Sequence, residues 1–336
     1  MDILNALVAF LNFVFVPAFG YGCQLALGAL GVTLIFAVLR FSSFAHGDTM
    51  AFGTVMAIGF TYVLQANGIT FGPLPTALLA LPFAILCTAL MLLGTDRLVY
   101  RFYRKKRVDP IIVTIASVGV MFVMNGINRL IPWGGVEEIN FADGSRFLME
   151  AAAFKEMTGL KEGLAIKTTT AVTVVTAALC VAALFWFLQK TRTGKSMRAF
   201  SDNEDLALLS GINPERVVQV TWIIVAALAT IAGVLYGLDK SYRPFVYFQL
   251  LLPIFSAAVV GGLGSPLGAI AGGFVIAFSE VMVTYAWKKV AGYLFPADWL
   301  GDGLLQLLST DYKVAVSFAI LLLVLLVKPT GLFKGK

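Results

Sequence analysis

The chain has 336 residues, of which 59% are hydrophobic and only 13% are charged, and its mean hydropathy is +0.87. About a quarter of the residues of a soluble domain are charged, so a water-soluble fold of this length could not bury so much apolar surface. The net charge of +6 is compatible with nucleic-acid binding. Basic cytoplasmic loops are the simpler cause in a membrane protein, so we expect no nucleic-acid partner. The composition therefore predicts a polytopic membrane protein.

A membrane-spanning helix needs about 20 mainly apolar residues. Eight segments meet this requirement, namely 20–39, 48–66, 73–94, 110–131, 168–189, 217–238, 265–287 and 312–328. Residues 246–263 form a shorter candidate, and residues 3–18 are a further span, a half-span or an extension of the first helix broken at Pro17. We expect an all-α fold with 8 to 10 transmembrane helices, some of them short or broken, in one membrane domain over residues 1–336.

The basic residues of the connecting loops predict the orientation. The loop 95–109 has six Lys or Arg residues and the loop 190–216 has five, so both are placed in the cytoplasm. The loop 132–167 has six acidic residues against four basic ones and is placed outside. The tail with Lys328, Lys334 and Lys336 is placed inside.

This orientation has two consequences for the rest of the chain. Two crossings are needed between Arg243 and Lys288, with a turn at 264–266. Residues 40–47 then lie at the cytoplasmic surface or dip back into the membrane from it.

The sequence offers little for catalysis or metal binding. Residues 193–196, TGKS, resemble the end of a phosphate-binding loop, but the glycine that this motif needs five positions before Gly194 is replaced by Gln189. The three cysteines lie in separate apolar segments, and His46 is the only histidine, whereas a metal site needs several ligands. We therefore predict neither a catalytic residue nor a metal site.

The cytoplasmic loop 190–216 contains a predicted short helix, SDNEDLALLSG. Ser201 and Glu204 have the spacing of a capping box, and Gly211 suits the position after the helix. Three apolar residues share one face at helical spacing: Leu206, Leu209 and Ile212. This face either docks a partner or packs on the membrane domain itself, and the pattern alone does not separate the two. Asn213-Pro214-Glu215 is typical of the start of the next membrane helix.

The stretch RFSSFAHGDTM, residues 40–50, contains His46 between two apolar segments. Gly47 fits a helix-ending turn, Asp48 fits the N-cap of the next span, and Arg40 suits the cytoplasmic end of the preceding helix. We interpret the stretch first as a polar hinge between two helices. A contact to substrate is the second interpretation.

Ionisable and polar groups inside membrane spans are functional candidates by default. Glu280 lies in the outer half of its predicted helix, where it either faces the translocation pathway or pairs with Arg129 or Lys288. Asn125 and Asn128 are expected near the outer end of their span, where they bond across helices or touch solute. Weaker candidates of the same kind are Gln24 and Thr33.

A glycine-rich segment near the end of the chain repeats every four residues, at Gly264, Gly268 and Gly272. Such small-xxx-small spacing lets membrane helices approach closely. Tight helix packing is the simpler interpretation, and a helix that lines a pathway between two subunits would show the same pattern.

Four segments resemble permease subunits of branched-chain amino acid ABC importers. These are RAFSDNEDLALLSGINPERVVQVTWIIVAALATIAGVLYG, FSSFAHGDTMAFGT, FSAAVVGGLGSPLGAIAGGFVIAFSE and VLLVKPTGL, in the family's order. Ser43 and Asp48 stand where the family has Asn and Glu, and Asp205-Leu206-Ala207 departs from the broader pattern of ABC importers. The resemblance implies a fold like that of type II ABC importer permeases. It also implies a coupling helix in which Ala207, Gly211 and Ile212 meet the ATPase.

The resemblance further implies an inner-membrane transport subunit that is not itself an enzyme. Two related permeases would pair, two cytoplasmic ATPases would bind ATP-Mg beneath them, and a periplasmic binding protein would deliver the solute. This chain would bind no cofactor. A permease for urea, amides or another small solute is an alternative. An ion-coupled secondary transporter is more distant, because only His46, Asp48 and Glu280 could serve as its buried ionisable groups.

Overall fold

The computed structural model describes residues 2–131, 139, 141, 146–294, 303 and 305–333. Within these ranges, nine helices are long and apolar enough to cross a membrane. They comprise Asp2–Leu39, α3 (His46–Ala66), Ala77–Lys105, α6 (Pro110–Leu130), α8 (Thr168–Lys190), α11 (Pro214–Lys240), α12 (Pro244–Gly261), α13 (Pro266–Thr284) and Thr310–Val327. The predicted all-α fold is confirmed, and the number of spans lies within the expected 8 to 10.

The first span is one continuous helix that includes residues 3–18. It consists of α1 (Asp2–Phe10), a π-helical turn η1 (Leu11–Phe15) and α2 (Val16–Leu39). The π turn lies directly before Pro17, where it accommodates a residue that cannot donate a backbone hydrogen bond. At 1.5 Å per residue the helix is about 57 Å long. The N-terminal segment is therefore an extension of the first helix, and a separate span is excluded.

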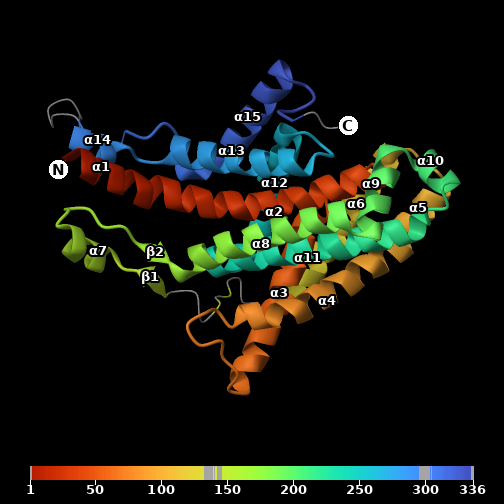
Figure 1. Ribbon diagram of the computed structural model, residues 1–336, viewed down its shortest axis with the longest axis horizontal. Helices are drawn as coiled ribbons and strands as arrows, with labels where there is room; N and C mark the ends of the chain where they lie inside the picture. The colour runs from red at the N-terminus through yellow and green to blue at the C-terminus, as the bar shows by residue number, and fades with distance from the viewer. Residues whose placement is uncertain are drawn as a thin grey trace.

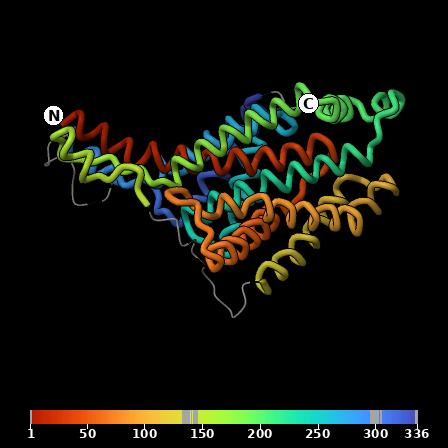
Figure 2. The backbone as a smooth tube through the Cα atoms, turned by 60° about the horizontal axis from the view of Figure 1, so that its bottom comes forward, coloured from red at the N-terminus to blue at the C-terminus, as the bar shows by residue number. Residues whose placement is uncertain are grey.

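Helix α2 forms the centre of the bundle. It is buried along most of its length and contacts α13, α11, α12 and α8. Figures 1 and 2 both show α8 and α11 running alongside it. Its glycines allow these close approaches, because a Cβ at Gly22 would meet Phe274 and one at Gly28 would meet Ile254.

Helices α12 and α13 form an antiparallel pair around the predicted turn. A Cβ at Gly268 would collide with the carbonyl of Gly261, and one at Gly272 with the carbonyl of Ala257. These two glycines therefore support close helix packing as expected. Gly264 does not, because it lies in the turn before α13 with a φ of +86°, a conformation that only glycine adopts readily.

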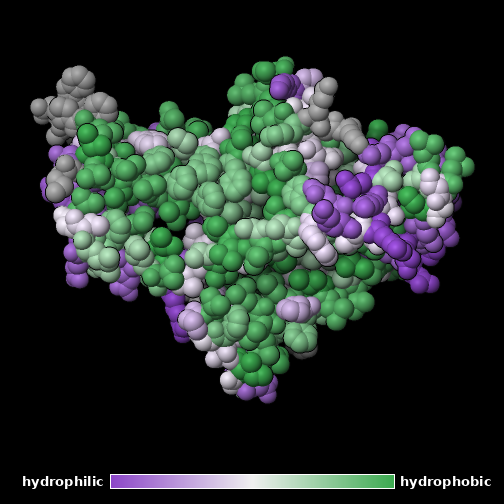
Figure 3. Space-filling model, in the orientation of Figure 1, coloured by the Kyte–Doolittle hydropathy of each residue, from purple (hydrophilic) through white to green (hydrophobic). Residues whose placement is uncertain are grey.

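The two ends of the bundle carry the short elements. At one end lie η2 (Asp96–Tyr100), α5 (Arg101–Lys105), α9 (Arg192–Asp202) and α10 (Glu204–Leu209). At the other end lie α7 (Ala151–Thr158), the antiparallel pair β1 (Phe147–Met149) and β2 (Ile166–Lys167), and α14 (Lys288–Leu294), next to α1. Figure 3 shows hydrophilic residues at both ends and a broad hydrophobic surface between them. This distribution fits a bilayer around the middle of the molecule.

The remaining spans extend this arrangement. Helix α4 (Ala77–Thr95) continues through η2 and α5, and the short η4 (Thr310–Tyr312) leads into α15 (Lys313–Val327). After α15 the chain returns to the turn between α12 and α13, where the amides of Leu332 and Phe333 donate to the carbonyls of Val260 and Gly261. Lys334 and Lys336, on which the placement of the tail partly depends, lie outside the described residues.

Candidate functional site: the loop 190–216 and the buried turn

The predicted helix of the loop 190–216 is present as α10, but its cap differs from the prediction. Asn203 is the N-cap, and its side chain accepts a hydrogen bond of 3.0 Å from the amide of Leu206. Ser201 belongs to the preceding helix α9, so the expected capping box of Ser201 with Glu204 is wrong. An extended Asn is as good a cap as Ser, and it stops α9 one residue before α10 begins. Gly211 follows α10 with a φ of +78°, as predicted.

The face of α10 is divided between the protein and its surroundings. Ala207 is buried, whereas Leu206 is 60% exposed and Leu209 is 85% exposed. Ile212 is half-buried and packs against the main core. Packing on the membrane domain is observed for part of the face, and docking of a partner by the rest stays a prediction. Ala207 and Ile212 fix α10 to the membrane domain, and the two leucines remain free for a partner.

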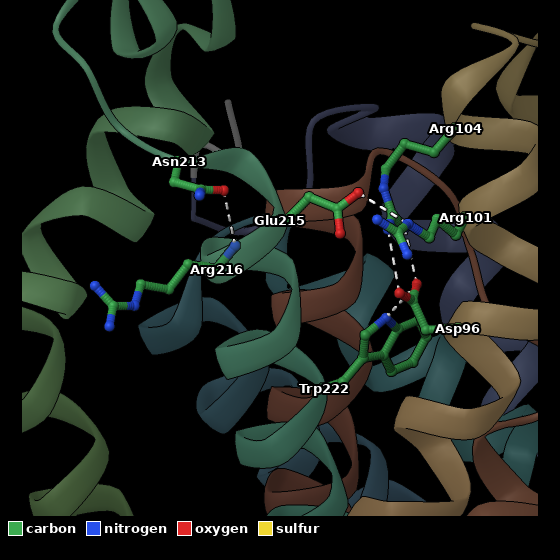
Figure 4. Close-up of polar contacts among 7 residues, drawn as sticks. All are labelled: Asp96, Arg101, Arg104, Asn213, Glu215, Arg216 and Trp222. Atoms are coloured by element: carbon green, nitrogen blue, oxygen red, sulfur yellow. Dashed lines mark hydrogen bonds and ion pairs between the residues drawn. The ribbon is translucent and has the colours of Figure 1, made fainter.

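The end of the loop is tied firmly to the first turn of α11. Asn213 caps α11 by accepting from the amide of Arg216, 3.3 Å away. In the same turn the Glu215 carboxylate accepts a bond of 2.9 Å from Nε of Arg101 in α5. Figure 4 shows these contacts beside a second ion pair. These contacts connect the end of the loop to α11 and α5.

The second ion pair involves Asp96, at the start of η2. Its two oxygens accept from Arg104 at 2.8 and 3.1 Å, and Oδ1 also accepts from the indole of Trp222 in α11 at 2.9 Å. The Trp222 ring stacks on Tyr100. We name Asp96, Arg104 and Trp222 the Asp96 clasp (Figure 4). It joins α4 and α5 to α11 just below the loop 190–216.

The loop also contacts the stretch that contains His46. Arg40 forms the C-cap of α2 with a φ of +60°, and its guanidinium donates to the carbonyl of Ser201 at the end of α9. The predicted position of Arg40 at the end of α2 is correct. The contact to Ser201 was not predicted, because 161 residues separate the two partners in sequence.

Residues 40–45 form a turn that folds back into the bundle. The amide of Phe44 donates to the hydroxyl of Ser117 in α6 at 3.0 Å, and the imidazole of His46 lies against Gly31 of α2. Gly31 is eight residues before the end of α2, which corresponds to about 12 Å along the helix. The turn thus dips inward from the end of α2 and does not lie at the surface.

The helix after the turn starts earlier than expected. Helix α3 begins at His46 with Ala45 as its N-cap, so Asp48 lies in the first turn and is not the N-cap. Gly47 is inside the helix and does not end one. A Cβ at Gly47 would collide with the carbonyl of Tyr247 in α12. Glycine is therefore required at this position by a close approach of helices, which sequence spacing alone did not indicate.

Three of the predicted pathway residues meet around the first turn of α3. The side-chain amide of Asn125 donates to Oδ1 of Asp48 at 2.9 Å, and that of Asn128 donates to the backbone carbonyl of Asp48 at 2.9 Å. Asp48, Asn128 and His46 are at most 1% exposed. We name His46, Asp48, Asn125 and Asn128 the α3 polar cluster.

The α3 polar cluster is not fully hydrogen-bonded. Within the described part of the chain, Oδ2 of Asp48 and Oδ1 of Asn128 have no hydrogen-bond partner, and neither has the hydroxyl of the nearby Tyr242. Most buried polar groups in proteins are paired, so each exception calls for an explanation. A turn that must rearrange during function is one explanation, because its groups find partners in another conformation.

Glu280 lies apart from the α3 polar cluster. Its carboxylate accepts a hydrogen bond from the hydroxyl of Ser317 in α15 and interacts with Tyr21 of α2 and with Lys313. The expected pairing with Arg129 or Lys288 is therefore wrong, and Arg129 instead lies near Asp48 and Tyr242. Lys313 and Ser317 are four residues apart and therefore share one face of α15. This spacing is the sequence signal that could have indicated that both residues meet the same neighbour.

The TGKS stretch lies inside α9. Thr191 caps that helix, and its hydroxyl accepts from the amide of Gly194 at 3.0 Å. Residues 193–196 are helical and therefore do not form a phosphate-binding loop.

An all-α membrane bundle with a buried polar turn and a short exposed helix at one end has the features of a transport protein. Comparison with known proteins agrees. A family model described as branched-chain amino acid transport system / permease component matches residues 16–325. The high-affinity branched-chain amino acid transport system permease protein LivH of Escherichia coli is 30% identical over 318 residues, which cover 93% of this chain and 91% of that protein.

Two further relatives agree with this match. The permease protein BraD of Pseudomonas aeruginosa is 28% identical and covers 93% of this chain and 92% of its own. The probable permease LivH of Methanocaldococcus jannaschii is 28% identical, covering 93% of this chain and 89% of its own. The chain belongs to the family of branched-chain amino acid transport permeases.

Proposed function

We propose that the chain is the membrane-spanning permease subunit of a binding-protein-dependent importer of branched-chain amino acids. The observation that carries the proposal is the match of residues 16–325 to the permease family. ATP hydrolysis takes place in separate subunits, so this chain is not an enzyme and binds no cofactor, and ATP-Mg is bound by the partner ATPase.

The assembly follows from the same proposal. A second, related permease pairs with this chain, two ATPase subunits dock at the α9–α10 end, and a periplasmic binding protein meets the opposite end near α7 and α14. The protein crosses the inner membrane several times with its C-terminus in the cytoplasm. Two observations support this topology: the basic loops lie at the α9–α10 end, and residues 332–333 bond to the end of α12.

The contacts of α10 suggest how the ATPase drives transport. Leu206 and Leu209 offer an exposed apolar face to the ATPase, and Ala207 anchors the same helix inward. Movement of α10 reaches α11 through the Asn213 cap and α9 through Asn203, and Arg40 connects α9 to the buried turn. ATP must bind the two conformations of the importer with different affinity for this shift to occur.

Substitution of Leu209→Asp tests the docking face. A carboxylate at this 85% exposed position cannot enter an apolar interface without a large desolvation cost. We expect loss of ATPase docking and of ATP-driven leucine uptake, with the membrane domain still inserted. Co-purification of the ATPase subunit and uptake into proteoliposomes measure the two effects.

The matched control is Ser196→Asp, which adds the same charge on α9 away from the leucines and should leave docking intact. Wild-type ATPase stimulation by the Leu209→Asp variant would show that α10 is not the dock. Uptake that persists without any ATPase and collapses with an uncoupler would contradict the proposed function itself.

A further inference from the structure

A cavity of about 650 Å³ lies in the half of the bundle opposite the loop 190–216. It is lined by parts of α2, α8, α11, α12, α13 and α15 and by the β1–β2 ribbon. Figure 3 shows a recess between α2 and α8 beside this ribbon. The volume falls within the range of about 300–1,000 Å³ of small-molecule sites. The α3 polar cluster does not line it.

One wall of the cavity carries a buried acid. Glu280 is 1% exposed, accepts from Ser317 and interacts with the Tyr21 hydroxyl. A carboxylate inside a membrane span is expensive and is normally kept for a function or for a partner. The two hydroxyls neutralise none of its charge, so the carboxylate can also accept a cationic group of a ligand.

A base faces the same cavity from α15. Lys313 places its ammonium 4.9 Å from the centre of the Tyr21 ring and is attracted by Glu280. Among the described residues, the ion pairs closer than 4.0 Å do not include one between Lys313 and Glu280. The two charges therefore line one cavity without closing on each other.

The side chain of Gln24 is a third polar group in the cavity wall, and one of its atoms lacks a partner. Gln24 is 4% exposed and lines the cavity. Its side-chain nitrogen donates to the carbonyl of Leu235 at 3.4 Å, whereas its oxygen Oε1 has no partner. A buried acceptor without a donor costs about 1–3 kcal/mol, so a donor from a bound molecule would remove this cost.

Apolar and further charged residues share the rest of the cavity wall. Its apolar residues include Val16, Val246, Leu250, Pro253, Val281 and Val314. Of the further charged residues, Asp239 and Lys240 form an ion pair with each other at 3.5 Å, and Lys167 and Asp311 also line the cavity. A ligand that suits the wall around Glu280 and Lys313 therefore has one cationic group, one anionic group and an apolar side chain.

We propose that this cavity binds a free α-amino acid with an apolar side chain, with its ammonium at Glu280 and Gln24 and its carboxylate at Lys313. The inference rests on the proposed function, because it gives the imported solute a binding site within this subunit. A zwitterion pairs with both Glu280 and Lys313, whereas an amine or a carboxylic acid alone pairs with only one of them. The site lies in the outer half of the span, where solute released by a binding protein would arrive.

Binding of leucine to the whole importer tests the inference. The permease pair with its ATPase subunits is placed in nanodiscs without binding protein, and radiolabelled leucine is titrated. The probes are leucine, 4-methylpentanoate, which lacks the ammonium group, and 3-methylbutylamine, which lacks the carboxylate. We expect saturable leucine binding and an affinity about tenfold or more weaker for either analogue, since each loses a charge-assisted contact.

Two variants assign the charges to residues. Glu280→Gln should weaken leucine binding about tenfold and remove the preference for leucine over 4-methylpentanoate. Lys313→Gln should also weaken leucine binding about tenfold, but it should remove the preference for leucine over 3-methylbutylamine. Glu156→Gln and Lys155→Gln, on exposed positions of α7, are the controls and should bind leucine normally. A variant that misfolds would lose all three probes together, so the selective losses separate binding from folding.

The outcomes distinguish the inference from the function on which it rests. Equal affinity of the wild-type importer for leucine and both analogues, or no leucine binding, would overturn the inference. Unchanged leucine affinity in both variants would do the same. Failure of the wild-type importer with its binding protein to take up any branched-chain amino acid would instead overturn the proposed function.

Discussion

Asp96 and Asp48 are two buried aspartates whose surroundings differ in one respect. Both oxygens of Asp96 have partners, in Arg104 and Trp222. Asp48 has one oxygen bonded to Asn125, and the other has no partner among the described residues. The first aspartate lies next to the loop 190–216, and the second lies in the first turn of α3, inside the bundle.

Under the proposed function, we expect this difference to separate a part that transmits movement from a part that rearranges. A fully paired buried network holds its geometry, since breaking any bond leaves a group without a partner. An incompletely paired network has less to lose when it rearranges. We therefore expect the Asp96 clasp to move as a rigid unit with α10 and α11, and the α3 polar cluster to exchange partners as the pathway opens.

The largest effect on stability is expected from Asp96→Ala. The substitution leaves the Trp222 indole and the Arg104 guanidinium without their acceptor. Removing one partner of a buried ion pair costs about 3–5 kcal/mol, and the partial exposure of Arg104 (31% of its side chain) favours the lower end of this range. The midpoint of thermal unfolding in detergent measures the loss.

Glu215→Gln is the matched control for Asp96→Ala. It breaks the Arg101 ion pair, whose side chains are 35% and 39% exposed, and exposed pairs contribute about 0–1 kcal/mol. If both variants unfold at the same temperature, the Asp96 clasp is no stronger than a surface contact, and the comparison with Asp48 has no basis.

Asp48→Asn is expected to affect transport more than stability. Its oxygen can still accept from Asn125, and the change removes a charge from the interior of a span, so stability should change by less than about 1 kcal/mol. If the free carboxylate oxygen acquires a partner when the turn rearranges, the maximal rate of leucine uptake should fall about tenfold.

Thr33→Val provides the control for Asp48→Asn. The Thr33 hydroxyl is also buried and without a partner in the described structure, but it is not part of the α3 polar cluster. We expect this variant to keep wild-type uptake and melting temperature. A loss of stability without a loss of uptake in Asp48→Asn would show that Asp48 has only a structural role.

The sequence predicted the spans well because hydropathy and loop charge act locally. The turn at 264–266, the Asn213 cap and the Gly211 position all depend on residues close together in the chain, and each was correct. The prediction for Ser201 failed for a local reason, since two helices compete for the same five polar residues and Asn203 is an equally good cap.

The partners of the buried polar groups could not be predicted. Glu280 meets Ser317 and Tyr21 rather than Arg129 or Lys288, because helix order around a bundle is set by packing of small residues and not by depth alone. The inward path of residues 40–45 depends likewise on Gly31 and Gly47, which admit His46 and Tyr247 at close range. A single sequence shows where such glycines are, but it does not show which residues pack against them.

A polar contact at the opposite end of the bundle extends the comparison to another buried and paired carboxylate, whose basic partner Lys289 is half-exposed. Glu162, before β2, accepts from Tyr293 at 2.8 Å and pairs with Lys289 of α14 at 2.9 Å. The backbone amides of residues 161 and 162 donate to Asn5 of α1. These contacts hold the segment before β2 against α1 and α14, so they could couple the outer loop to the bundle.

The smallest and most pH-dependent effect is expected here. Burial raises the pKa of Glu162, but the hydrogen bonds from Lys289 and Tyr293 and the charge of Lys289 outweigh it and hold the pKa below its ordinary value. A lowered pKa means that the contact stabilises the fold above the ordinary glutamate pKa of about 4.3 and that this contribution disappears as the pH falls below it.

Hydrogen exchange of the amides of residues 161–165 should therefore become faster, relative to its intrinsic rate, as the pH falls from neutral to acidic. Glu162→Gln should exchange faster at neutral pH and lose most of this dependence, whereas Glu156→Gln should match the wild type. An unchanged profile in Glu162→Gln would show that the pairing of Glu162 contributes nothing measurable to the stability of this segment.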